Sequence, residues 1–167
     1  LKQAEEGELY KQLAYIDEMT GLHNRSAYEE YLMENSKTDA ASYVLMMDLN
    51  NLKQCNDILG HRVGDDYIMK AAASIRKVLE PHGCCYRIGG DEFVVIVKGK
   101  TQDEMDVIIH QTQENVNAIA WGADTPWQLS ISIGCAMRGE QGKQKSHELL
   151  ALADERMYRQ KKGIQDR

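Results

Sequence analysis

The sequence lacks several features that mark common classes of protein. No apolar run among its 167 residues approaches the length of a membrane span, and no signal peptide opens the chain. No basic run is present either, and the net charge of −6 argues against a nucleic-acid-binding surface. We therefore expect a cytoplasmic domain that contacts neither a membrane nor nucleic acid.

The spacing of the cysteines indicates neither a metal site nor a set of disulfides. The four of them, at positions 55, 84, 85 and 135, show no C-x-x-C spacing and no nearby histidine pattern. Zinc binding is therefore not expected, and reduced cysteines are the default. The chain also has no internal repeat and no low-complexity tract. Its length suits a single domain with a real core. Because it begins at Leu1 rather than at a methionine, we expect a fragment of a longer protein, whose missing N-terminal region could carry a membrane anchor.

The most informative stretch is Arg87–Phe93, which reads Arg-Ile-Gly-Gly-Asp-Glu-Phe. The apolar run Cys84–Ile88 precedes its glycines and the run Phe93–Val97 follows, a pattern that predicts a β-hairpin. We expect the paired glycines to supply a positive-φ turn and to let a large anionic ligand approach the backbone. Asp91 and Glu92 then lie at the tip. The alternative is an ordinary surface turn with solvated acids.

A second acidic position lies upstream. Tyr43–Met47 is an unbroken apolar run, typical of a strand buried on both faces, and it ends in Asp48. This carboxylate is either a capping residue or a ligand. If the hairpin lies beside that strand, Asp48 and Asp91 form a carboxylate pair that suits a hard divalent cation such as Mg²⁺, which keeps positions free for water and substrate phosphate.

The remaining pattern alternates helices with strands. Leu1–Ile16 predicts a helix whose apolar stripe either packs on the domain or pairs with another copy as a coiled coil. A long helix is expected from about Val63 to Leu79, and a Thr101–Glu104 capping box opens another. A late strand over 129–135 and a helix from Ser146 complete the order. This order predicts an α/β or α+β sheet with mixed pairing.

These motifs carry a family resemblance. Gly89–Phe93 is the sequence Gly-Gly-Asp-Glu-Phe, which names the GGDEF family of bacterial diguanylate cyclase domains. Further segments resemble the family's motifs in the right order over nearly the whole chain: Asp17–Arg25 (D-x-L-T-G-L-x-N-R, with Met19 for Leu), Asp48–Asp57, Gly60–Asp65, Ser130–Gly134 and Ala153–Tyr158.

The resemblance implies a fold and a domain division. The fold would be ferredoxin-like and palm-type, a mixed sheet with flanking helices as in nucleotidyl cyclases. Residues 1–16 would form a linker or stalk helix, and residues 17–167 the GGDEF domain.

The resemblance also implies a reaction, in which two GTP condense to cyclic di-GMP and release two pyrophosphates. It implies Mg²⁺ as cofactor, with two ions expected and Mn²⁺ as a substitute. Each domain would hold one GTP, so turnover would require a homodimer. The domain would be the output of a bacterial signalling protein with an upstream sensor domain.

Residue roles follow motif by motif. The metal ligands would be Asp48, the carbonyl of Leu49 and Asp91. The catalytic turn would comprise Gly89, Gly90, Asp91 and Glu92, with Glu92 in support. The substrate-binding positions would be Asn51, Leu52, Lys53 and Lys161 for phosphate, Asn56 and Asp65 for guanine, and His61 near the base or ribose.

The chain departs from the family pattern at several places. Asn50 and Leu52 replace an Asp and a Phe, and Glu80–Gly83 stands where the family often has an inhibitory R-x-x-D. Gln165 replaces an arginine, and Gly163 comes one place early. Two alternatives stay open: a catalytically silent GTP-binding regulatory module of the same fold, and another nucleotidyl cyclase using ATP, which Asp65 disfavours.

Overall fold

The computed structural model describes residues 1–34, 42–119 and 128–165. Within this part of the chain, no helix is both long and apolar enough to cross a membrane. The helices are α1 (Lys2–Tyr15), α2 (Arg25–Glu34), α3 (Leu52–Leu59), α4 (His61–Leu79), α5 (Gln102–Asn117), the 3₁₀ turn η1 (Glu140–Gly142) and α6 (Ser146–Gln165). The strands are β1 (Ser42–Leu49), β2 (Gly83–Arg87), β3 (Glu92–Lys98) and β4 (Ile131–Met137).

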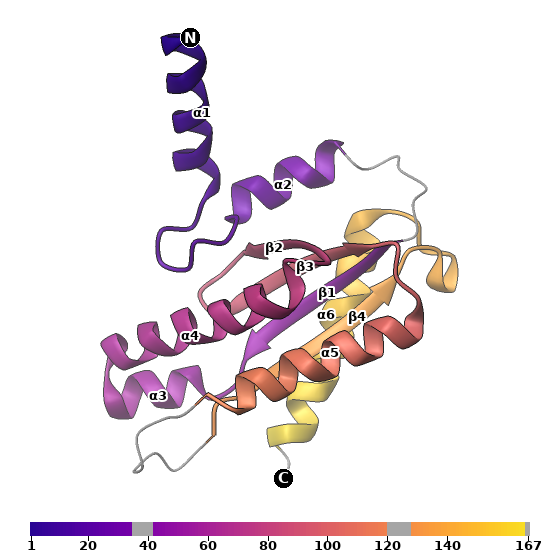
Figure 1. Ribbon diagram of the computed structural model, residues 1–167. Coiled ribbons are helices and arrows are strands. Elements are labelled where there is room, and N and C mark those ends of the chain that lie inside the picture. Colours follow the sequence, from indigo (N-terminus) through magenta and orange to yellow (C-terminus); the bar gives the residue numbers. More distant parts are fainter. Residues whose placement is uncertain (35–41, 120–127, 166–167) are drawn as a thin grey trace.

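The four strands form one sheet in the order β2-β3-β1-β4 (Figure 1). The α/β architecture of a sheet with flanking helices is confirmed, but the three ladders between these strands are all antiparallel, which corrects the expected mixed pairing. The strands β1 and β2, which helices connect, run in the same direction, and so do β3 and β4. However, β3 lies between β1 and β2 in the sheet, and β1 lies between β3 and β4, so strands that run in the same direction are not paired with each other.

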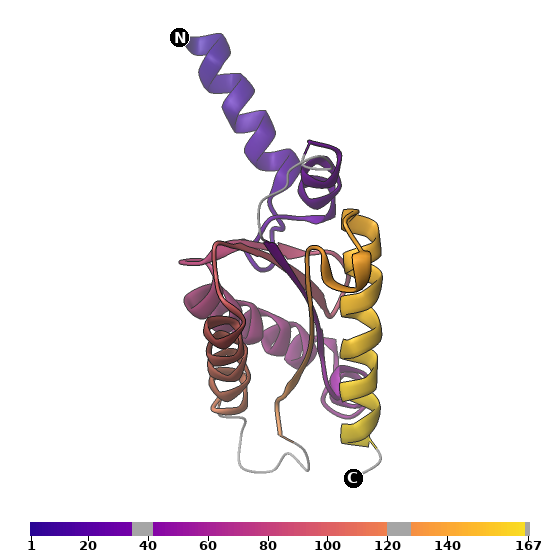
Figure 2. The ribbon, with the colours of Figure 1, turned by 90° about the vertical axis from the view of Figure 1, so that its right-hand side faces the viewer.

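Helices cover both faces of the sheet, as Figure 2 shows edge-on. Successive side chains along each strand point to opposite faces of the sheet, so the strands contribute to two hydrophobic cores, one on each face. On one face, Leu45, Met47 and Val95 are buried beneath α4 and α5. On the other face, Val44, Met46 and Val94 are buried beneath α6 and α2. The strand β1 is therefore buried on both sides, as its unbroken apolar run predicted.

Two helices differ from the sequence prediction. The helix α4 begins at His61, two residues before the expected start. The helix α3 was not predicted from the sequence. It has eight residues, and Cys55 is its fully buried residue. A helix this short is marginal alone, so its packing beside α4 stabilises it.

The helix α6 packs closely on the edge strand β4. A Cβ added at Gly134 would lie 1.8 Å from the carbonyl oxygen of Ala153, so only glycine permits this approach. Side chains of α6 also pair with the outward peptide groups of β4: Arg156 Nη1 donates to the Cys135 carbonyl at 2.7 Å, and the Ile133 N–H donates to Gln160 Oε1 at 2.7 Å. These contacts place the C-terminal half of α6 along the sheet.

The helix α1 projects away from the rest of the molecule (Figure 1). None of its 14 residues, all of which the structure describes, is buried. Leu9 and Leu13 of its apolar stripe are 56% and 69% exposed. Of the two alternatives for this stripe, packing against its own domain is therefore contradicted.

Candidate active site

The hairpin and the strand before Asp48 lie side by side, as the carboxylate-pair hypothesis requires. In the β1–β3 ladder Asp48 is paired with Glu92, and the Leu49 N–H donates to the Asp91 carbonyl at 3.1 Å. The backbone register therefore brings together the end of β1 and the start of β3, which are more than forty positions apart in the sequence.

The Asp48 side chain is mostly enclosed, with 14% of its surface exposed. Its Oδ2 accepts a hydrogen bond of 2.7 Å from Lys161 Nζ, which also lies 3.4 Å from the Leu49 carbonyl oxygen. Burial raises the pKa of Asp48 to about 6; Lys161 opposes this shift, and the neighbouring Asp91 carboxyl adds to it. Asp48 is thus ionised at neutral pH, but it protonates more readily than an ordinary aspartate.

The oxygens at this position fit a hard divalent cation. Asp48 Oδ1 is buried and finds no hydrogen-bond donor among the described residues. The Asp91 carboxyl lies near enough to raise the pKa of Asp48. Two carboxylates and one backbone carbonyl are the oxygen ligands that Mg²⁺ accepts. No group of three or more His, Cys, Asp or Glu side chains suited to a metal occurs among the described residues. The set predicted here requires only two such side chains.

The turn between β2 and β3 is shaped differently from the sequence prediction. Gly89 and Gly90 are not among the positive-φ glycines of the chain, so the expected positive-φ turn is wrong. A Cβ on Gly89 would lie 3.3 Å from Glu92 Oε2, which shows that the Glu92 carboxylate folds back over the turn. A Cβ on Gly90 would meet nothing within 4 Å, so its backbone is open to a ligand.

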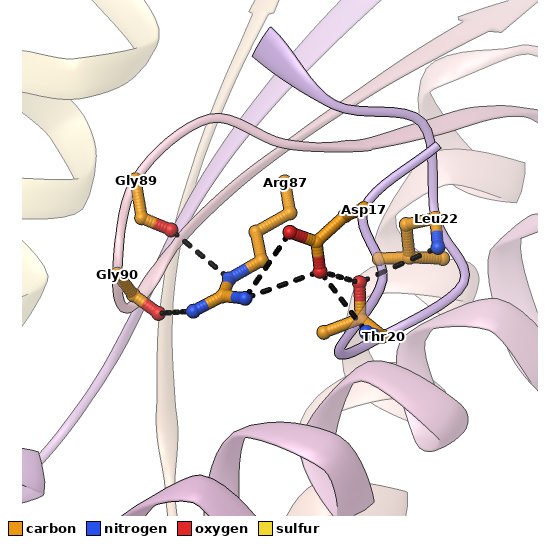
Figure 3. A network of polar contacts seen from close by, with 6 residues as sticks. All are labelled: Asp17, Thr20, Leu22, Arg87, Gly89 and Gly90. Atoms are coloured by element: carbon orange, nitrogen blue, oxygen red, sulfur yellow. Dashed lines mark hydrogen bonds and ion pairs between the residues drawn. The ribbon is translucent and has the colours of Figure 1, made fainter. Parts of the chain in front are cut away.

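Arg87 holds this turn (Figure 3). Its Nε donates to the Gly89 carbonyl at 3.1 Å, and its Nη2 donates to the Gly90 carbonyl at 2.9 Å. Its Nη1 pairs with Asp17 Oδ2 at 3.1 Å. Both side chains are mostly enclosed, 13% and 22% exposed. The rigid guanidinium fork therefore fixes both glycine carbonyls and an ion pair at once.

Asp17 is fixed in turn by Thr20, whose N–H and hydroxyl donate to Asp17 Oδ2 at 3.0 and 2.6 Å (Figure 3). Burial raises the pKa of Asp17, but the hydrogen bonds from Thr20 and Arg87 outweigh burial and lower it below the ordinary value. Asn24, at the other end of the segment 17–24, bonds to both α1 and α2. Its Nδ2 donates to the Ala14 carbonyl at the end of α1, and its Oδ1 accepts from the Ala27 N–H of α2. The end of α1 is thus connected through residues 17–24 to the Gly89–Gly90 turn.

Asp17→Asn is expected to lower turnover by about 10-fold to 100-fold, because even a ~1 Å displacement of a reacting group costs that much. It should also lower the free energy of unfolding by about 2 kcal/mol, the typical loss for a hydrogen-bonded charged group. Steady-state kinetics and thermal unfolding of the variant measure the two effects. Glu18→Gln, at the exposed neighbouring position, is the matched control. Wild-type turnover in Asp17→Asn would show that this network does not position the turn.

The N-terminus of α3 opens into a pocket beside the carboxylates. This pocket, of about 600 Å³, is lined by Leu49, Asn50, Asn51, Leu52, Lys53, Gln54, Asp91 and Lys161. Asn51 precedes the helix in a left-handed conformation, with φ of 66°. The first backbone N–H groups of a helix have no partner within it, and they attract anions. Leu52 and Lys53, two of the predicted phosphate-binding positions, therefore lie at a helix N-terminus.

The predicted guanine-binding residues, Asn56 and Asp65, lie further along the α3–α4 hairpin. Neither is among the described residues that line the pocket. Asn56 is one helical turn beyond the N-terminus of α3, ~6 Å along its axis. Its Oδ1 is buried without a described partner. A Cβ on Gly64 would lie 1.7 Å from this atom, so the glycine makes room for the Asn56 amide. Asp65 follows Gly64 and is half-buried, whereas His61 is exposed at the start of α4.

Asn50 has a structural role that the sequence did not reveal. Its side chain is buried, donating to Ser130 Oγ at 2.9 Å and accepting from Ser132 Oγ at 3.0 Å. Tyr67 donates to its carbonyl oxygen. Asn50 thus fastens the end of β1 to the start of β4, and a carboxylate could not donate the first of these bonds. The signal in the sequence was the pair of serines at positions 130 and 132.

Lys161, the predicted phosphate ligand near the C-terminus, is engaged with the Asp48 carboxylate. Gly163 is exposed within α6, and a Cβ there would meet nothing within 4 Å. Gln165 ends the helix, and its side chain lies outside the described residues.

The fold and this site define a palm-type domain with a carboxylate pair beside a helix N-terminus. The chain belongs to the GGDEF family: the family model described as "Diguanylate cyclase, GGDEF domain" matches residues 14–167. This match confirms the resemblance drawn from the motifs.

Curated relatives share the domain within longer proteins. The chain is 32% identical over 155 residues to the probable diguanylate cyclase DgcI of Escherichia coli, covering 90% of the chain and 32% of DgcI. It is 30% identical over 154 residues to the bifunctional diguanylate cyclase/cyclic di-GMP phosphodiesterase MucR of Pseudomonas aeruginosa, covering 90% of the chain and 22% of MucR. The chain thus spans about a third or less of these proteins.

Among solved structures, the coiled coil and GGDEF domain of DgcB from Caulobacter crescentus, in complex with c-di-GMP, is similar with a TM-score of 0.85. The match is 24% identical and covers 97% of this chain and 88% of that one. At this identity the comparison supports the fold.

Proposed function

We propose that this domain condenses two molecules of GTP into cyclic di-GMP and releases two pyrophosphates. The observation that carries the proposal is a carboxylate pair at one pocket. Asp91 lines this pocket together with the N-terminus of α3, and Asp48, whose Oδ1 is buried without a described donor, lies next to Asp91. In the reaction, the 3′-oxygen of one nucleotide forms a bond to the α-phosphorus of the other, and the bond from that phosphorus to pyrophosphate breaks. Two such steps close the ring.

Each group around the pocket would have one task. Magnesium held by Asp48, the Leu49 carbonyl and Asp91, as two ions or with Mn²⁺ in its place, would neutralise phosphate charge and lower the pKa of the attacking hydroxyl. The N–H groups at the start of α3 and the Lys53 ammonium would bind the triphosphate. Arg87 keeps the Gly89–Gly90 backbone open to the substrate, and Glu92 would support the reacting groups from above the turn.

Guanine selectivity would come from the α3–α4 hairpin. A carboxylate at Asp65 accepts from the N1–H and N2–H₂ edge, which adenine lacks. The buried Asn56 Oδ1 is an acceptor without a described donor, so a base N–H would relieve its desolvation cost. His61 would lie at the base or ribose. A site that must pair such donors rejects the wrong base strongly, which disfavours ATP as substrate.

Turnover would require two copies, because one domain presents one such site. We propose that α1 is a stalk that pairs with a second copy through its exposed stripe. The DgcB structure, which includes a coiled coil before its GGDEF domain, overlaps 97% of this chain and supports this role. The domain would act in the cytoplasm as the output of a longer signalling protein with an upstream sensor.

The direct test is incubation of the purified protein with GTP and Mg²⁺, followed by chromatography and mass spectrometry. We expect cyclic di-GMP and pyrophosphate in a 1:2 ratio as the reaction stoichiometry requires, no product from ATP, and no product after chelation of the metal. Absence of product from protein that is folded and concentrated enough to dimerise would refute the proposal.

The second candidate, a silent GTP-binding regulatory module, is not favoured, because the matching family model and the relative DgcI are both described as diguanylate cyclase. Two observations keep it testable: Lys161 is paired with Asp48, and Gln165 stands in place of a family arginine. Equilibrium binding of GTP without formation of cyclic di-GMP would identify this alternative.

A further inference from the structure

Lys161 contacts two oxygens of the predicted metal-ligand set. Its ammonium lies 2.7 Å from Asp48 Oδ2 and 3.4 Å from the Leu49 carbonyl oxygen. With side chains 22% and 14% exposed, Lys161 and Asp48 form a mostly enclosed ion pair, whereas most surface pairs are solvated and weak. The contact joins the last helix to the end of the first strand.

The fold holds Lys161 at this position. The preceding residue, Gln160, accepts a hydrogen bond of 2.7 Å from the Ile133 N–H. Arg156 binds both the Cys135 carbonyl and Glu140, the latter at 2.9 Å. The backbone of α6 is therefore fixed along β4, and the freedom of Lys161 lies in its four-carbon stem.

The ammonium and a divalent cation exclude each other here. Mg²⁺ binds its oxygen ligands at ~2.1 Å, and Lys161 Nζ lies 2.7 Å from Asp48 Oδ2, so an ion on this oxygen would lie within about 5 Å of the ammonium. Two positive charges at that separation in a partly enclosed site repel strongly. The pocket that contains Lys161 also contains the phosphate-binding N-terminus of α3, so the ammonium can turn toward phosphate while α6 stays in place.

We infer that Lys161 is a placeholder cation, which neutralises Asp48 before the metal enters and turns to the substrate triphosphate when the metal takes its place. This inference rests on the proposed function and deepens it. In metal-free protein the ammonium offsets the cost of enclosing the Asp48 carboxylate beside Asp91. In the loaded site the same ammonium offsets phosphate charge.

Cooperative binding of metal and nucleotide follows from this exchange. A metal ion that binds without nucleotide must displace Lys161 from Asp48, and the Lys161 ammonium is then left without an anionic partner. When a triphosphate is bound, Lys161 has a new partner and the displacement costs less. Coupling of this kind is reciprocal, and couplings between sites are typically ~5-fold to ~150-fold in affinity.

The experiment measures Mn²⁺ binding by electron paramagnetic resonance, with and without 3′-deoxy-GTP, which lacks the attacking hydroxyl. It uses the same buffer and pH for every protein compared. We expect 3′-deoxy-GTP to strengthen Mn²⁺ binding to the wild type. In Lys161→Met, we expect Mn²⁺ alone to bind at least ~5-fold more tightly than to the wild type, and the strengthening by nucleotide to shrink by a similar factor. Lys162→Met, at the exposed neighbouring position, should match the wild type.

The outcomes separate this inference from the proposed function. Equal or weaker binding of Mn²⁺ alone to Lys161→Met would overturn the placeholder role; Lys161→Gln provides a second variant should the first fail to fold. Mn²⁺ binding that Asp48→Asn leaves unchanged would overturn both the metal site and the inference. Tighter Mn²⁺ binding to Lys161→Met, in a protein whose wild type forms no cyclic di-GMP, would support the inference while the proposed reaction fails.

Discussion

Asp91→Asn is expected to lower the rate of cyclic di-GMP formation by at least ~1000-fold. A catalytic metal stabilises several kcal/mol of transition-state charge, and each 1.4 kcal/mol lost is a factor of ten in rate. A neutral amide is a poor Mg²⁺ ligand. The fold should survive, because the contribution of Asp91 to the sheet is its backbone carbonyl, which accepts from the Leu49 N–H and is unchanged in the variant.

Three measurements check this prediction. Turnover should fall, the thermal unfolding midpoint should stay near that of the wild type, and Mn²⁺ should bind more weakly. The pKa of Asp48 should move back toward its ordinary value, since the Asp91 carboxyl contributes to its rise. Asp103→Asn, an exposed position at the start of α5, is the matched control. Turnover near the wild-type level would show that Asp91 is not a metal ligand.

Specific activity is expected to rise with protein concentration, because each domain presents one GTP site and two must meet. The dimerising element proposed here is α1, whose 14 residues bury none of their side chains on the domain. Isolated helices of this length are marginal in water, so the protein should be largely monomeric when dilute. A parallel coiled coil fused before Leu1 supplies an effective concentration of ~mM, and activity in dilute solution should then increase by orders of magnitude.

The control is a second fusion in which the coiled coil is joined to Leu1 in a different helical register. Two extra residues between the coiled coil and Leu1 rotate the domains by about 200° around the helix axis. Both fusions should be dimers by sedimentation, but only the one that faces the two sites toward each other should be strongly active. Flat specific activity across a wide dilution series, with monomer as the only species in sedimentation, would contradict the dimer requirement.

Local patterns determined most of the elements that build the site. The apolar run ending at Asp48 predicted a buried strand, and β1 is buried on both faces. The runs around Gly89 and Gly90 predicted the hairpin, and the strands β2 and β3 do pair. The Thr101–Glu104 capping box is present as predicted. Periodicity and capping are encoded within a few residues, so the sequence reveals them without knowledge of the rest of the chain.

The tertiary structure decided how these pieces act on one another. Arg87 and Asp17 are 70 residues apart, and Lys161 and Asp48 are 113 apart. No local pattern relates such positions, because their pairing depends on the ladder order and on the close seating of α6 at Gly134. The glycine turn was mispredicted for the same reason: an arginine held by a distant aspartate shapes it, in place of the glycines' own freedom at positive φ. The helix α3 also owes its existence to long-range packing, since eight residues alone cannot offset the cost of helix nucleation.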